Sequence, residues 1–211
     1  MPGCTPACKG QRMSSLAYSD GFLCLVSLWL ATRTRSPIAL RLACTLFAAA
    51  AVLGVLRFSG IYPLPGWHQF ASMLGAMAAL PLLAVSVIWP DSLVTRNKRF
   101  AWIFMGVMAV LGVLIVGAGQ KRVVADALAV LSVVAMVFTL ARGGLWRGAL
   151  AAALLLAGLL LFAAKVTVGD VQVPGDLLHI GMALGLLGLG TLPLWSSTEG
   201  VSVYDHGAPV V

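Results

Sequence analysis

Residues 148–164 read GALAAALLLAGLLLFAA and carry no charge between Arg147 and Lys165. A helix that spans a bilayer needs about 20 mostly apolar residues, so this stretch has the composition of a membrane span. The whole chain is similar, because 60% of its 211 residues are hydrophobic and only 10% are charged. Soluble domains are about 25% charged, and disordered chains combine low hydrophobicity with high charge. The composition therefore excludes both a soluble globular protein and a disordered one.

Six further apolar runs have a comparable length, so the sequence predicts an all-α polytopic membrane protein with seven transmembrane helices and short loops. The predicted spans are residues 16–31, 38–56, 68–89, 101–117, 123–141, 148–164 and 177–195. The predicted domains are an N-terminal tail at 1–15, a seven-helix bundle at 16–195 and a polar tail at 196–211. The first run could also be a cleaved signal peptide, and translation could begin at Met13. The ATRTR sequence after that run favours a retained helix.

The 14 Lys and Arg residues give a net charge of +7 and lie mostly between apolar runs, which indicates membrane topology and no nucleic-acid partner. Counted around alternating loops, eight basic residues fall on one side and six on the other. Five of the six tryptophans fall at the ends that have more positive charge: Trp29, Trp89, Trp102, Trp146 and Trp195. Because loops rich in Lys and Arg stay in the cytoplasm, the sequence predicts an inner (plasma) membrane protein with its N-terminus outside and its C-terminus in the cytoplasm.

Ionisable side chains inside a membrane are costly and usually mark a site or a structural pair. The predicted topology brings most of them to the outer end of the bundle: Asp20, Arg57, His68, Gln120, Asp126, Asp176 and His179. We expect an outward-facing polar pocket there. Asp20, Arg57 and His68 are the candidate ligand-binding residues, with Arg57 as the anchor for an anionic group. Arg57 could instead extend to the interface, and Asp126 is explained by an ion pair with Arg122.

Asp176 and His179 are the candidate catalytic residues, because their i, i+3 spacing puts both on one face of a helix. The carboxylate could orient the imidazole, or both groups could share a metal ion or a proton. The alternative is structural: Asp176 is a first-turn acid stabilised by the helix dipole, and His179 bonds a neighbouring carbonyl. His179 and His68 are the tentative metal ligands. In the same helix, Gly181 and Gly185 form a GxxxG motif, which favours close helix contact within the bundle over a dimer interface.

Three features together resemble a known family: LGVLRFSG at the end of the second helix, a histidine at the start of the third, and DLLHIGMALGL opening the seventh. The chain resembles uncharacterised bacterial members of the CREST-like superfamily of seven-helix membrane proteins, which includes alkaline ceramidases and the progestin and adipoQ receptors. The resemblance implies that fold. It also implies zinc-dependent amide hydrolysis, with a serine and a histidine in helix two, an aspartate in helix three and two histidines in helix seven.

The residues at those positions differ in part. His179 fills one histidine position of the seventh helix, while Gly175 stands at the other. Arg57 or Phe58 stands where helix two has its histidine, and the third helix has no aspartate. The resemblance therefore supports the fold more strongly than the activity.

The sequence supports three functional hypotheses, of which the first is favoured. It is a non-catalytic role in binding, sensing or assembly, with membrane lipids, a lipid-like small molecule or a membrane protein as partner. The first alternative is a metal-dependent lipid or acyl-amide hydrolase with zinc as cofactor and His179 as ligand or base. The second is a small transporter, against which the apolar middles of helices two, five and six argue.

Overall fold

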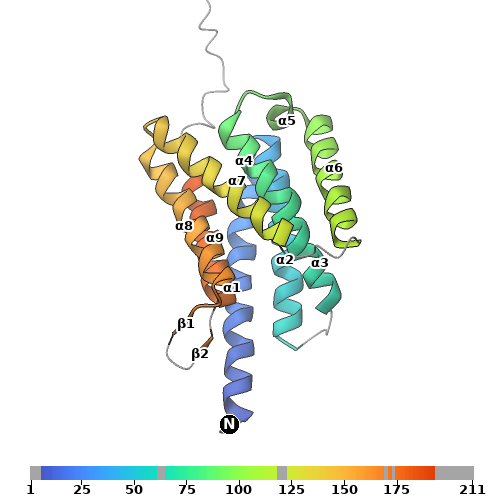
Figure 1. Cartoon of the computed structure of the whole chain (residues 1–211), viewed down its shortest axis with the longest axis vertical. Coiled ribbons are helices and arrows are strands. Elements are labelled where there is room, and N and C mark those ends of the chain that lie inside the picture. The colour runs from blue at the N-terminus through green and yellow to red at the C-terminus, as the bar shows by residue number, and fades with distance from the viewer. Residues whose placement is uncertain (1–5, 61–64, 118–122, 169–170, 173, 193–211) are drawn as a thin grey trace, which may run out of the picture.

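The computed structural model describes residues 6–60, 65–117, 123–168, 171–172 and 174–192, and these form an almost wholly helical bundle (Figure 1). The helices are α1 (Pro6–Thr32), α2 (Ile38–Phe58), α3 (Pro65–Leu74), η1 (Gly75–Ala79), α4 (Leu80–Ile88), α5 (Leu93–Arg96), α6 (Lys98–Gly117), α7 (Val123–Arg142), α8 (Trp146–Ala163) and α9 (Pro174–Gly190). Before α9, the two-residue strands β1 (Thr167–Val168) and β2 (Val171–Gln172) pair antiparallel.

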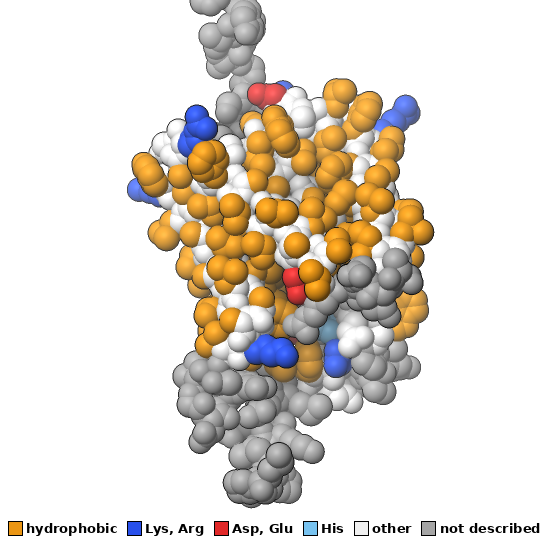
Figure 2. All heavy atoms as spheres, in the orientation of Figure 1, with side chains coloured by type: hydrophobic (Ala, Val, Ile, Leu, Met, Phe, Trp, Pro, Cys, Tyr) orange, Lys and Arg blue, Asp and Glu red, His pale blue; other side chains and the backbone are white. Residues whose placement is uncertain are grey.

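Six helical segments of the described chain are long and apolar enough to cross a membrane, and α9 is a shorter apolar helix of 17 residues. At 1.5 Å per residue α9 is about 25 Å long, slightly less than the roughly 30 Å of a hydrocarbon core. On the face shown in Figure 2, apolar side chains cover the middle, and Lys and Arg lie toward the two ends. The chain is therefore a helical membrane protein.

The helix boundaries agree with the predicted spans in the middle of the chain and differ at its ends. α7 begins at Val123 as predicted, but α1 begins at Pro6, so residues 6–15 of the predicted tail are helical. α9 begins at Pro174, three residues early, because proline is well suited to the first turn of a helix. It ends at Gly190, and residues 193–195 of the predicted span lie outside the described residues.

The third predicted span is one continuous rod, but it contains a π-helical segment, Gly75–Ala79, between α3 and α4. Pro81 lies just after this segment and has no backbone N–H to donate, and its ring would clash with the carbonyl four residues earlier in a regular helix. A π turn is one way to absorb such a defect. The segment therefore sets how α3, which has His68 near its start, is rotated relative to α4.

α1 lies at the centre of the arrangement, between α2 on one side and α9 on the other (Figure 1). Successive spanning helices alternate in direction, and α6 lies at the edge of the bundle with much of its surface exposed. The core consists mainly of aliphatic side chains from all the central helices, including Leu30, Leu40, Leu83, Leu155 and Leu186. Because α1 contacts both α2 and α9, polar residues on α1 can meet partners from both.

The GxxxG motif of α9 packs inside the bundle, as predicted. A Cβ on Gly181 would lie 3.0 Å from the carbonyl oxygen of Leu154, and one on Gly185 would lie 2.8 Å from that of Ala151. Both contacts are with α8, so the glycines allow two helix backbones to approach closely. This contact fixes α9, and with it the position of His179.

Candidate functional site

The candidate site lies on the seam between α1 and α9, at the end of the bundle where α9 begins. Asp176 is in the first turn of α9, and His179 follows one turn later on the same face. α1 presents Ser15, Ser19 and Asp20 to them. Five side chains from two helices therefore form one hydrogen-bonded cluster, which we call the seam cluster.

Asp176 accepts hydrogen bonds from two hydroxyl groups of α1. Ser19 Oγ donates to Asp176 Oδ1 at 2.7 Å, and Ser15 Oγ donates to Asp176 Oδ2. The carboxylate also lies at the positive end of the α9 dipole, which favours a negative charge. Asp176 thus lies in the first turn of α9, as the structural interpretation expected, and its hydrogen bonds also join α9 to α1.

His179 pairs with Asp20, not with Asp176. Its Nδ1 lies 3.1 Å from Asp20 Oδ1, and the two side chains are 15% and 1% exposed. The predicted i, i+3 pair on α9 therefore shares a face without pairing, because the Asp176 carboxylate is turned to the serine hydroxyls. When Nδ1–H donates to the Asp20 carboxylate, the neutral imidazole keeps Nε2 as a free acceptor.

Asp20 is buried with one of its two oxygens unused. Its Oδ2 makes no hydrogen bond to any residue that the structure describes. The carboxylate fits only because residue 54 of α2 is glycine: a Cβ there would lie 2.5 Å from Asp20 Cγ and 2.8 Å from Oδ1. Asp20 thus lies where α1, α2 and α9 meet, and Gly54 makes the space for it.

Arg57 and His68, both predicted as ligand-binding residues, lie beside the seam cluster and are not hydrogen-bonded to it. The guanidinium carbon of Arg57 lies 5.1 Å from the centre of the Phe58 ring, and its charge acts on Asp20. His68 Nδ1 lies 3.3 Å from the backbone oxygen of Ala50, and its ring meets Phe58 edge-on at 5.5 Å. The structural alternative predicted a hydrogen bond from His179 to a backbone carbonyl. In the structure His68 makes such a bond, and His179 pairs with Asp20.

The zinc site implied by the family resemblance does not fit the side chains that the structure describes. Among those residues, no three His, Cys, Asp or Glu side chains converge as ligands for one metal ion. A hydrolytic zinc site uses three protein ligands and a water. The predicted pair His68 and His179 supplies two ligands at most, one fewer than such a site needs.

Sequence reasoning missed the two serines and Gly54. Ser15 and Ser19 are four residues apart, which puts both on the same face of α1, and Asp20 follows directly. That spacing could have indicated a polar face on the first helix. Nothing in the sequence pairs Gly54 with Asp20, because the contact depends on how α1 and α2 are aligned.

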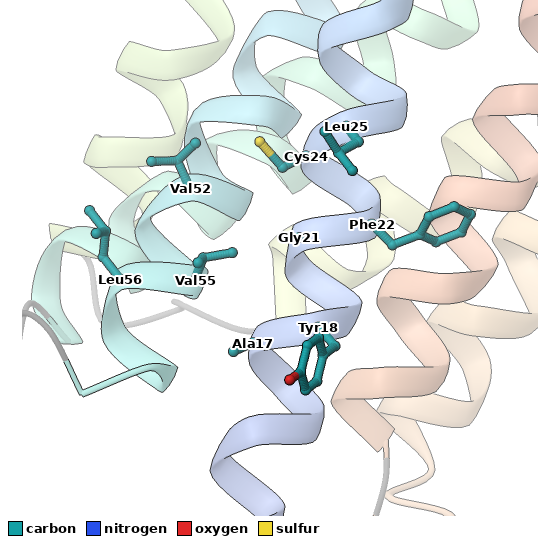
Figure 3. Close-up of a pocket in the computed structure, with 9 residues that line it drawn as sticks. All are labelled: Ala17, Tyr18, Gly21, Phe22, Cys24, Leu25, Val52, Val55 and Leu56. Carbon is teal, nitrogen blue, oxygen red and sulfur yellow. The ribbon is translucent and has the colours of Figure 1, made fainter.

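A groove of about 540 Å³ lies between α1 and α2, next to the seam cluster (Figure 3). Its walls are Ala17, Tyr18, Gly21, Phe22, Cys24, Leu25, Val52, Val55 and Leu56. Tyr18 and Leu25 are 79% and 69% exposed, so the groove opens sideways, toward lipid in a membrane. This groove is apolar, whereas the predicted pocket was polar and outward-facing.

The fold and the seam cluster define a class of protein: a helical membrane protein with a buried Asp–His pair at one end of its bundle. No family model matches the chain, and no curated protein or solved structure gives a match to it. The geometry of the seam cluster is therefore the feature that indicates a function.

Proposed function

We propose that this protein is a non-catalytic binding protein of the membrane, which holds the polar group of a lipid-like small molecule at the seam cluster. The observation that carries the proposal is Asp20, which is 1% exposed and has one carboxylate oxygen without a partner among the described residues. Burying a carboxyl group with one oxygen left without a hydrogen bond costs about 1–3 kcal/mol. An arrangement so costly inside a membrane segment usually serves a function.

The binding role is favoured over the hydrolase because the serine beside His179 is not activated. Ser19 Oγ donates its proton to Asp176 at 2.7 Å, and it lies 3.5 Å from Nδ1, the same nitrogen that pairs with Asp20. A nucleophile–base pair needs the serine on the other imidazole nitrogen, with the carboxylate on Nδ1. Neither this arrangement of Ser19 nor the two histidines, which are too few to hold a hydrolytic zinc ion, support hydrolysis.

The transporter is also disfavoured by the local hydrogen bonds of three hydroxyl groups along the helices. Ser86 and Ser132 donate to backbone oxygens of their own helices, those of Leu83 and Leu128. Thr45 does the same to Arg41. These hydroxyl groups are occupied locally, so they do not form a polar path across the middle of the bundle.

We also propose a topology for the chain and a kinship with a known superfamily. The protein has seven transmembrane helices in the inner (plasma) membrane, with its N-terminus outside and its C-terminus in the cytoplasm, which the Lys and Arg distribution supports. The order of its helices supports kinship with the CREST-like superfamily. With this orientation the seam cluster lies at the outer end of the bundle.

Native mass spectrometry of the full chain, released gently from its own membranes, tests the binding role. We expect a bound small molecule on the wild-type protein that is strongly reduced in Asp20→Asn. Asp91→Asn is the matched control, because Asp91 is exposed and pairs with Arg96 away from the seam cluster. The proposal would be contradicted if the wild-type protein carried no bound molecule, or if all three proteins carried the same ones.

A further inference from the structure

We infer that the seam cluster recognises an ammonium group that carries N–H donors, either on the head of a membrane lipid or on a free amine. This inference rests on the proposed binding function and adds the chemistry of the ligand. It differs from the expectation drawn from the sequence, in which Arg57 anchors an anion. Three observations support it: the charges in the cluster, the unused acceptor atoms and the access to them.

The charges of the cluster favour a cation. Asp20 and Asp176 are close enough for their charges to interact, and each is hydrogen-bonded to neutral or weakly basic groups. Among the described residues, no Lys or Arg forms an ion pair with either carboxylate, and Asp20 pairs only with His179. Arg57 contributes charge from a distance, without a direct contact. A bound cation would offset negative charge in the cluster, whereas a bound anion would add to it.

The free atoms of the cluster are acceptors. Asp20 Oδ2 has no partner among the described residues. His179 Nε2 is an acceptor when Nδ1–H donates to Asp20, and the described side chains make no hydrogen bond to it. A primary ammonium has three N–H donors and no acceptor, so it complements a site whose free atoms are acceptors. Its hydrogen bonds to a carboxylate are of the stronger, charge-assisted kind.

The seam cluster reaches the surface at the end of the bundle where α9 begins. Ser15 is exposed and Asp176 is half-buried, while His179 is 15% exposed and Asp20 is 1% exposed. The seam cluster thus extends from the exposed Ser15 to the buried carboxylate of Asp20. The apolar groove between α1 and α2 begins at Ala17 and Tyr18, one helical turn from Ser15. A ligand that joins an ammonium to an apolar chain could therefore contact both surfaces.

The test is thermal unfolding of the purified full chain, titrated with probes that separate charge from hydrogen bonding. Methylammonium is the free-amine probe, and tetramethylammonium has the same charge without an N–H donor. Inorganic phosphate is the anionic probe. If the ligand is a free amine, we expect methylammonium, and neither of the other two probes, to raise Tm by about 5–10 °C at a hundredfold excess over Kd. A rise with tetramethylammonium of the same size, or with phosphate, would overturn the inference.

A second arm places the protein in nanodiscs of phosphatidylcholine with or without phosphatidylethanolamine, whose headgroups differ in N–H donors. A rise in Tm with phosphatidylethanolamine and not with methylammonium identifies a lipid source, and the reverse identifies a free amine. Either result supports ammonium recognition. No rise with either probe would overturn it.

Variants connect the effect to the cluster. Asp20→Asn should raise the Kd of the effective probe about 10- to 100-fold, the size expected for losing a charged hydrogen bond, whereas Asp91→Asn should leave it unchanged. If Asp20→Asn does not fold, Asp176→Asn removes the second charge and should also weaken binding. A Kd unchanged in Asp20→Asn or in its substitute would contradict the inference. If native mass spectrometry finds an anionic or neutral ligand that depends on Asp20, the binding role stands and only the ammonium inference fails.

Discussion

Asp20 and Gly54 lie so close across the contact of α1 and α2 that a Cβ on residue 54 would be 2.5 Å from Asp20 Cγ. The neighbour is a buried carboxylate, which is 1% exposed and already paired with His179. It cannot move aside without breaking that pair. Gly54 is therefore a positioning residue, because the absence of a side chain there leaves the space that the Asp20 carboxylate occupies.

Gly54→Ala should push the Asp20 carboxylate away from α2. We expect a loss of about 1–3 kcal/mol in the free energy of unfolding, the usual cost of overpacking a tight site. The measurement is thermal or denaturant unfolding of the purified protein in detergent. Gly106→Ala is the matched control, because that glycine of α6 has nothing within 4 Å of an added Cβ. It should stabilise by about 0.4–1 kcal/mol, and equal losses in both variants would contradict the role of Gly54.

The Asp20–His179 pair should be coupled more strongly than the surface pair of the same protein. In a double-mutant cycle with Asp20→Asn and His179→Gln, we expect a coupling energy of about 1–3 kcal/mol, because the pair is buried. The exposed pair Asp91–Arg96, with side chains 78% and 53% exposed, should give about 0.2–1 kcal/mol. Both cycles use unfolding free energies under the same conditions. Equal coupling in the two cycles would show that burial adds nothing to the Asp20–His179 pair.

The fold was largely predictable because apolar length is a strong signal. Six of the seven predicted runs correspond to helices long enough to span, and the seventh to the shorter α9. The differences have local causes. Pro174 starts α9 early, and Pro81 follows the π segment that no count of apolar residues reveals. Such features depend on backbone hydrogen bonds, which hydropathy does not record.

The seam cluster was predictable in part. The alternation of helices was enough to bring Asp20, Asp176 and His179 to one end of the bundle. It could not decide which carboxylate pairs with His179, because that depends on the rotation of α1 and α9 about their axes. Ser19 and Gly54 were missed for the same reason, since neither is unusual in a membrane helix until its neighbour is known.

Gly185→Ala should destabilise the bundle without changing its oligomeric state. An added Cβ would lie 2.5 Å from Leu155 Cγ and 2.8 Å from the Ala151 oxygen, both on α8. We expect a loss of about 1–3 kcal/mol in unfolding free energy, again with Gly106→Ala as the control. Native mass spectrometry gives the oligomeric state. If the variant keeps full stability and instead dissociates a dimer, Gly185 lies in an intermolecular contact.

The predicted orientation can be tested at the two ends of α2, where Thr34 and Ser59 are both exposed. In a chain whose four natural cysteines are replaced, Ser59→Cys should react with a membrane-impermeant maleimide added to intact cells. Thr34→Cys should react only after the membrane is permeabilised, because it lies in the loop with Arg33 and Arg35, which the charge distribution assigns to the cytoplasm. The seam cluster begins at the same end of the bundle as Ser59, so this result would place the seam cluster on the outer side of the membrane. Reaction of Thr34→Cys in intact cells with Ser59→Cys protected would invert the orientation and move the seam cluster to the cytoplasmic side. Equal reaction of both would mean that α2 does not cross the membrane.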